Sequence, residues 1–169
     1  MPHPGGSAII LANVLLCPMS RGTLKLRSSD PKDAPLLDPN LLANELDRQL
    51  IFSGGRLTIS MMQGPIGQKL GAQEYGIDKA IQGDTSDDAM MARLLKTGRT
   101  CNHGSGTCSM GSVVDTDCRV KGLEGLRVVD ASIFPMPVGA HYQAIVYAVA
   151  EQVSSLCRRC LMINEADWN

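Results

Sequence analysis

The chain has 169 residues, with 16 basic and 17 acidic side chains and a formal net charge of −1. This length suits one ordinary domain or one large piece of a bigger protein. The near-neutral charge excludes the basic footprint of a nucleic-acid-binding protein. No apolar run in the sequence approaches the roughly 20 residues of a membrane-spanning helix. We therefore expect neither a nucleic-acid partner nor a membrane partner.

Cysteine and aromatic residues are both sparse. Six cysteines are too few for a disulfide-stapled scaffold and indicate reduced thiols, as in a cytosolic protein. The aromatic content of 4% predicts an aliphatic core in which the nine methionines fill gaps.

The first part of the chain predicts strands followed by a helix. Residues 8–16 form a continuous apolar stretch of strand length, and residues 23–27 alternate polar and apolar side chains as a strand does. From residue 41 to residue 62, leucines and isoleucines recur at near-helical spacing and predict a helix. Gly54-Gly55 is its expected weak point.

A surface loop and a capped helix are predicted next. Residues 64–84 are rich in glycine and indicate a loop with a short helix inside it. The Thr85–Asp88 cluster is typical of a helix N-cap, and the good helix formers of residues 89–96 follow it. Gly98 is expected to end this helix.

The last part of the chain predicts two short strands and a long helix. The strands cover residues 113–115 and 126–129. Residues 144–161 carry apolar side chains at helical spacing and predict the long helix.

Two histidines lie in glycine-dense segments without periodicity. His103 belongs to the run Cys101–Gly111, and His141 lies just before the predicted last helix. A loop histidine that feeds a helix can carry a proton near neutral pH. From the pattern alone, a histidine that is merely hydrogen-bonded in its loop is the favoured interpretation for each of the two.

The region around these histidines resembles the C-terminal signature of the glucose–methanol–choline (GMC) family of FAD-dependent oxidoreductases. The resemblance begins near residue 15 and extends to residue 156. It is carried by Leu16-Cys-Pro-Met-Ser-Arg-Gly-Thr-Leu-Lys-Leu-Arg27, His103-Gly-Ser-Gly-Thr-Cys-Ser-Met110, Arg119-Val-Lys-Gly122, Gly125-Leu-Arg-Val-Val-Asp130-Ala131-Ser132 and His141-Tyr-Gln-Ala-Ile-Val-Tyr-Ala-Val-Ala-Glu151.

The resemblance implies oxidation of an alcohol, with a small-molecule alcohol as substrate and FAD as cofactor. His103 matches the family's catalytic histidine, the base that takes the hydroxyl proton while a hydride passes to flavin N5. His141 matches a second position, His in some members and Asn in others, which orients the substrate oxygen or shares the proton.

Four further positions match flavin contacts of the family. Asp130 and Ala131 correspond to the region near the ribityl and pyrophosphate groups. Tyr142 and Gln143, at the start of the last helix, correspond to backbone contacts near the isoalloxazine. For Asp130, a turn-capping carboxylate is the alternative interpretation.

The implied fold is α+β, with a mostly antiparallel sheet flanked by helices. Residues 8–161 are expected to form the GMC C-terminal domain, between a frayed segment at 1–7 and a tail at 162–169. The last strand and helix are expected to pack on an FAD-binding, Rossmann-like half that is missing here. No strand followed by G-x-G-x-x-G occurs in the sequence, so we expect no stable FAD site in this chain alone.

Two other functions remain open at this point. One is a redox-neutral cyclase or lyase on the same scaffold, and the other is a non-catalytic remnant. No metal site is expected, because Cys157-Arg-Arg-Cys160 lacks a second ligand pair and the acidic Asp84/Asp87/Asp88 cluster lacks EF-hand spacing.

Overall fold

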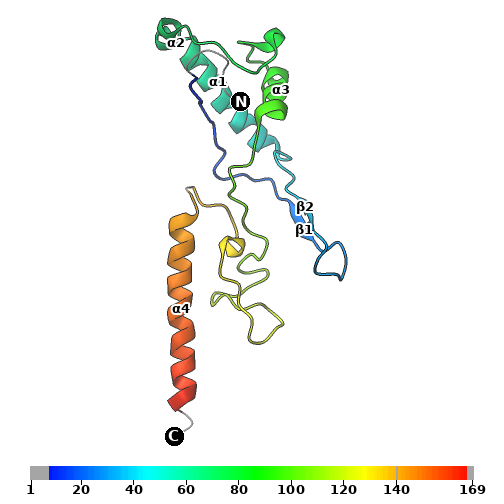
Figure 1. Cartoon of the computed structure of the whole chain (residues 1–169), viewed down its shortest axis with the longest axis vertical. Helices are drawn as coiled ribbons and strands as arrows, with labels where there is room; N and C mark the ends of the chain where they lie inside the picture. The colour runs from blue at the N-terminus through cyan, green and yellow to red at the C-terminus, as the bar shows by residue number, and fades with distance from the viewer. Residues whose placement is uncertain (1–7, 140, 167–169) are drawn as a thin grey trace. The chain divides into compact units, whose positions relative to one another are not determined.

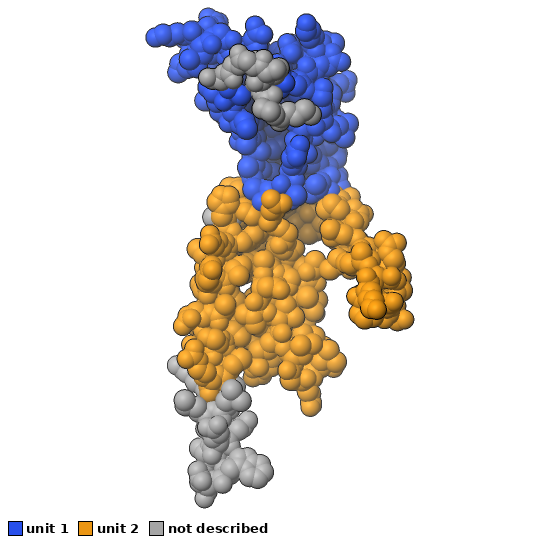
Figure 2. Space-filling view, in the orientation of Figure 1, with its two compact units in different colours: residues 1–15, 41–101 blue, residues 16–40, 102–169 orange. Residues whose placement is uncertain are grey.

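The structure is a computed structural model that describes residues 8–139 and 141–166 (Figure 1). Contacts divide the chain into two compact units, shown in two colours in Figure 2. The first unit comprises Met1–Leu15 and Leu41–Cys101, and the second comprises Leu16–Asn40 and Asn102–Asn169. Each unit has its own cluster of buried apolar side chains.

The first unit is helical. Its elements are α1 (Glu45–Gln63), α2 (Pro65–Leu70), the 3-10 turn η1 (Lys79–Ile81) and α3 (Asp87–Thr97). Both α2 and α3 contact α1. The predicted helix over residues 41–62 and the predicted loop with a short helix are confirmed.

The glycine pair in α1 is a packing point, and the helix runs through it without a break. A Cβ atom added to Gly55 would lie 3.1 Å from the Met90 sulfur of α3. A Cβ on Gly54 would lie 3.1 Å from Asn13 Oδ1. Missing side chains thus let α3 and the N-terminal segment approach the α1 backbone, which offsets the low helix propensity of glycine.

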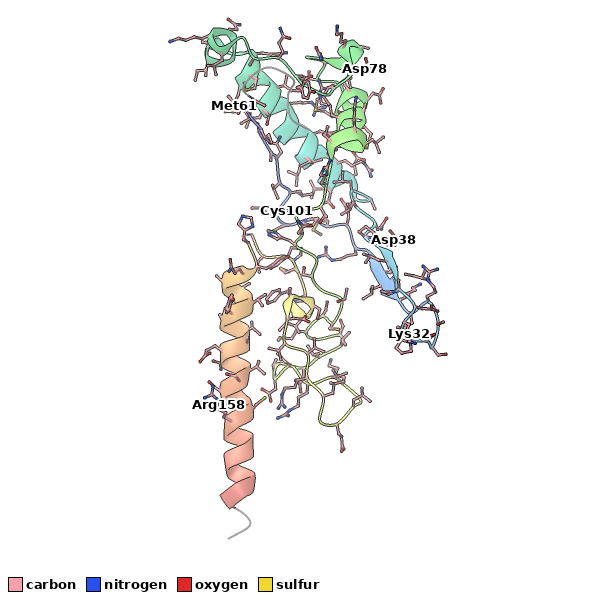
Figure 3. The ribbon with its side chains drawn as sticks, viewed as in Figure 1. Lys32, Asp38, Met61, Asp78, Cys101 and Arg158 are labelled. Atoms are coloured by element: carbon pink, nitrogen blue, oxygen red, sulfur yellow. The ribbon has the colours of Figure 1, made fainter. Side chains whose placement is uncertain are left out.

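The predicted N-cap of α3 is confirmed. The Ser86 hydroxyl accepts a hydrogen bond from Ala89 N at 3.3 Å, and Gly98 ends the helix. Arg93 of α3 donates to the Glu74 carboxylate at 2.9 Å and to the Asp84 carbonyl at 2.7 Å. These bonds fasten the preceding loop to α3. Figure 3 marks Asp78, which caps η1 in this loop.

The cores correct the expectation of an aliphatic interior. Phe52 is buried in the first unit beside Ile59 and Met90. Phe134 and Tyr142 are buried in the second unit. One aromatic ring buries a large apolar area, so one or two rings can contribute much of the buried surface of a small core.

The second unit contains a small antiparallel sheet of β1 (Thr23–Lys25) and β2 (Leu36–Asp38), with Thr23 opposite Asp38. Figure 3 shows Asp38 at the end of β2 and Lys32 in the loop between the two strands. Every residue of both strands is exposed. The strand predicted over residues 23–27 is therefore confirmed in its first three residues.

Three other predicted strands are wrong. Residues 8–16 form no strand, because a run of apolar side chains becomes a strand only beside a hydrogen-bonding partner, and the described residues offer it none. The segments 113–115 and 126–129 contribute only isolated bridges, which pair Val114 with Met110 and Val120, and Arg119 with Arg127. Tight turns between these short stretches interrupt the ladders after one pair.

The long helix α4 (Gln143–Ala166) covers the core of the second unit and lies beside the irregular segment that precedes it (Figure 1). Val153 is buried, and the α4 residues that pack around the same core are Ile145, Val146, Val149 and Cys157. The helix continues beyond the predicted end at residue 161. Within the described residues, no helix combines the length and hydropathy needed to cross a membrane.

The described elements place the chain in the α+β class, which confirms the predicted fold class. The sheet is smaller than expected, with two strands among the described residues. The domain boundaries at residues 8 and 161 stay a prediction. The segment 1–7, expected to be frayed, lies outside the described residues, as does the end of the expected tail at 167–169.

Cysteine reactivity tests the core of the second unit. Burial raises the pKa of the Cys118 thiol, with Asp115 adding to the effect, whereas Cys101 is exposed. We expect iodoacetamide at neutral pH to modify Cys118 more slowly than Cys101 by about tenfold or more, because the thiolate is the reactive form. Peptide mass spectrometry measures both rates. Equal rates in the folded chain would contradict the packing, and equal rates in denaturant are the control.

Candidate active site

The His103 segment is held against a short turn of the second unit. Three backbone hydrogen bonds run from Gly106 N, Cys108 N and Met110 N to the carbonyls of η2 (Ala131–Ile133). Their lengths are 3.3, 2.9 and 2.8 Å. We call these bonds the η2 ladder. The side chains of Ile133 and Phe134 are buried in the core of the second unit. The η2 ladder therefore ties the His103 segment to residues whose positions the core fixes.

The structure brings the two predicted histidines into direct contact. His141 Nδ1 lies 2.9 Å from His103 Nε2, and the two rings meet edge to face with centroids 4.9 Å apart. His103 is partly buried and His141 is exposed. One chain therefore presents two imidazoles that share a hydrogen bond.

The tautomers of the two rings are coupled by this bond. If His141 Nδ1 donates, His103 Nε2 accepts, His141 Nε2 keeps a lone pair and His103 Nδ1 carries a proton. If His103 Nε2 donates instead, His103 Nδ1 keeps the lone pair and His141 Nε2 carries the proton. In both cases the neutral pair offers one base and one hydrogen-bond donor, and it can take up one further proton while keeping its internal bond.

Tyr142 packs directly against the histidine pair. Its ring lies edge to face with His103, with centroids 4.9 Å apart, and is stacked with Phe134 at 5.7 Å. Its hydroxyl lies 3.0 Å from Ser105 Oγ. Only 7% of Tyr142 is exposed, so its side chain is part of the core.

The other predicted cofactor positions lie on two separate elements. Asp130 is exposed and caps η2, where its carboxylate accepts a hydrogen bond from Ser132 N at 2.8 Å. Its geometry matches the turn-capping alternative, which leaves its role toward flavin untested. The Ala131 carbonyl accepts from Gly106 N in the η2 ladder. Gln143 is exposed at the first position of α4.

Sequence reasoning missed Ser105 and Phe134, which position Tyr142. Neither residue type signals chemistry by itself, and their contacts join segments far apart in the chain. The one available signal was that Ser105 follows His103 closely in the same glycine-rich run. No group of three or more His, Cys, Asp or Glu side chains among the described residues could hold a metal ion.

An α+β unit that presents paired imidazoles has the groups that proton-transferring enzymes use. The chain belongs to the GMC oxidoreductase family, whose profile matches residues 18–150. The predicted family membership is thereby confirmed. The cofactor of this family and of its solved neighbours is FAD.

Curated relatives match almost the whole chain. It is 34% identical to the dehydrogenase mpl7 of Monascus purpureus over 94% of its own length and 25% of that protein. It is 39% identical to the dehydrogenase str4 of Strobilurus tenacellus, covering 93% of the chain and 27% of the relative. The chain thus spans about a quarter of the length of these relatives.

Solved structures agree with the family assignment. A fungal aryl-alcohol oxidase superposes with a TM-score of 0.69 and 35% identity, over 88% of this chain and 25% of that structure. An FAD-dependent oxidoreductase from Chaetomium thermophilum superposes with a TM-score of 0.75 and 29% identity. The superposition covers 85% of this chain and 25% of the chain of that oxidoreductase.

Proposed function

We propose that this chain is the catalytic C-terminal portion of an FAD-dependent oxidoreductase that acts on the CH–OH group of a small-molecule alcohol. The observation that carries the proposal is the 2.9 Å contact between His103 Nε2 and His141 Nδ1. Oxidation of an alcohol releases one hydroxyl proton, and the neutral histidine pair can accept one proton at the ring nitrogen whose lone pair is not used in the shared bond. The family supplies the redox half of the reaction.

The pair matches both needs of an alcohol oxygen. One outer imidazole nitrogen accepts the hydroxyl proton as a general base, and the other donates a hydrogen bond that orients the oxygen. We assign the base role to His103, which is the less exposed ring, and the orienting role to His141. Once His103 has accepted the hydroxyl proton at Nδ1, transfer of its Nε2 proton to His141 Nδ1 moves the positive charge to the exposed ring.

The assignment of the start of α4 to the isoalloxazine end of the flavin is supported by the chemistry of a helix N-terminus. The first backbone N–H groups of a helix have no acceptor within it, and this end of a long helix is electropositive. Tyr142 and Gln143 would hold the electron-rich edge of the ring there, while Asp130 and Ala131 would face the ribityl and pyrophosphate groups. When bound, FAD supplies the acceptor for the hydride.

The first experiment tests the cofactor and the reaction together. The 169-residue chain is titrated with FAD and desalted, and its visible spectrum is recorded. We expect no retained flavin, because the sequence holds no G-x-G-x-x-G cradle for the pyrophosphate. In the complete flavoprotein, anaerobic mixing with alcohols is expected to bleach the flavin band.

The two measurements have separate meanings. Stoichiometric flavin on the isolated chain would overturn the proposal that the missing half is needed to hold FAD. Turnover of a substrate by the complete protein with an unchanged flavin would contradict oxidation and favour the redox-neutral alternative.

A further inference from the structure

We propose that the Tyr142–Ser105 hydrogen bond is a positioning clamp that holds the two histidines at hydrogen-bonding distance. This inference rests on the proposed function only for its consequence for the reaction. The clamp joins Ser105, close after His103, to Tyr142, the residue directly after His141. One bond of 3.0 Å therefore ties together the two backbone segments that carry the imidazoles.

The η2 ladder begins at Gly106, so the stretch that carries His103 precedes the ladder and depends on a further restraint. Gly104 and Gly106 flank Ser105, and Gly106 adopts a φ of +83°, in the left-handed region that favours glycine. Asn102, on the other side of His103, also has a positive φ, of 58°. Glycine-rich backbone of this kind has many accessible conformations, so a side-chain anchor within it selects one.

The anchoring residue is itself fixed in place. Tyr142 is stacked with Phe134 and buried in the second unit's core, so its hydroxyl has a defined position. A buried phenolic hydroxyl without a partner is costly, which favours the bonded arrangement. The same ring forms one wall against His103. Tyr142 thus restrains the His103 segment through its hydroxyl, which bonds Ser105, and contacts His103 itself through its ring.

The chain offers a matched control. Tyr147 lies within α4, whereas Tyr142 directly precedes this helix, and 71% of Tyr147 is exposed. Replacing either tyrosine with phenylalanine removes one hydroxyl, yet only Tyr142→Phe removes the bond to Ser105.

The clamp is tested by nitrogen-15 NMR of the 169-residue chain, a readout that needs neither flavin nor activity. The parent chain is expected to show scalar coupling between His141 Nδ1 and His103 Nε2 across their hydrogen bond. Since one net hydrogen bond shifts an equilibrium by about fivefold, we expect Tyr142→Phe and Ser105→Ala each to lower the paired-to-separated ratio of the rings by about that factor. Tyr147→Phe should leave the coupling unchanged.

A double-mutant cycle separates a clamp from general damage. The Ser105→Ala/Tyr142→Phe double variant should lose no more coupling than either single variant, because both changes break the same bond. Ser105→Thr keeps a hydroxyl at this position and should therefore keep the coupling between the two imidazoles close to that of the parent chain. An unchanged paired-to-separated ratio in Tyr142→Phe, or additive losses in the double variant, would overturn the clamp.

The kinetic consequence is read in the complete flavoprotein. Tyr142→Phe is expected to lower the rate of flavin reduction about tenfold, with the substrate Kd changed less than about twofold, because small misplacements of a base affect chemistry more than binding. An unchanged rate with lost coupling would mean that the clamp exists and that the paired geometry is not what drives the reaction. Loss of the clamp and loss of the proposed function are thus distinguishable.

Discussion

His103→Ala in the complete flavoprotein is expected to lower the rate of flavin reduction by about 10²–10⁴-fold while FAD stays bound. The imidazole of His103 is the partly buried member of the pair, and its Nε2 bonds to His141 Nδ1. Removing it abolishes the proposed base and the shared bond at once. Stopped-flow absorbance at the flavin band measures the rate, and the desalted spectrum measures bound FAD.

His141 provides the comparison for this variant. His141→Asn keeps a side chain that can both donate and accept, so it should cost less than His141→Ala. If His103→Ala is reduced by substrate at the parent rate, His103 is not the base. If it loses FAD as well, the variant has disturbed the cofactor region, and the rate alone no longer assigns the role.

Ile133→Ala is expected to reduce the free energy of unfolding by about 2–5 kcal/mol, which is a large share of the stability of an ordinary domain. Ile133 is 1% exposed and lies at the centre of the second unit's core. The substitution leaves a cavity directly beneath the η2 ladder. Urea titration followed by circular dichroism measures the loss.

Leu123→Ala is the control within the same unit, because Leu123 is 59% exposed. Removing an exposed side chain should change the free energy of unfolding by no more than about 0.5 kcal/mol. Equal losses in the two variants would contradict the described core. Since Ile133 also accepts from Met110 N, a loosened core should weaken the ladder that carries His103.

Local signals in the sequence predicted the helices well. The Ser86 cap, Gly98 and the good helix formers between them define α3, and the apolar periodicity defines α1 and α4. All of these signals act within a few residues. The run at 8–16 was misjudged because a strand also depends on its partner, which local sequence does not contain.

The site was predictable only where a signal lies within one short stretch of sequence. The resemblance in sequence picked out His103 and His141, and the structure places them in contact. The Ser105–Tyr142 bond depends on how the His103 segment and α4 meet, which only the folded unit defines. At Gly54-Gly55, the low helix propensity of glycine predicted a weak point in the helix. The structure instead has a continuous helix there, with other segments packed closely against the two glycines.

The η2 ladder makes the length of the His103 segment part of the active site. Its donors are alternate residues of a stretch that turns at Thr107 and Cys108, whereas its acceptors are the consecutive carbonyls of a 3-10 turn. Two residues on the donor side correspond to one residue on the acceptor side, so the two partners do not share a repeat that could slip by one residue. An inserted or deleted residue between His103 and Gly106 would displace the imidazole by the advance of one residue, which is about 2 Å even in a tight 3-10 turn. That displacement exceeds the tolerance of about 1 Å that catalysis allows. The site can therefore accept a changed side chain in this stretch far more easily than a changed number of residues.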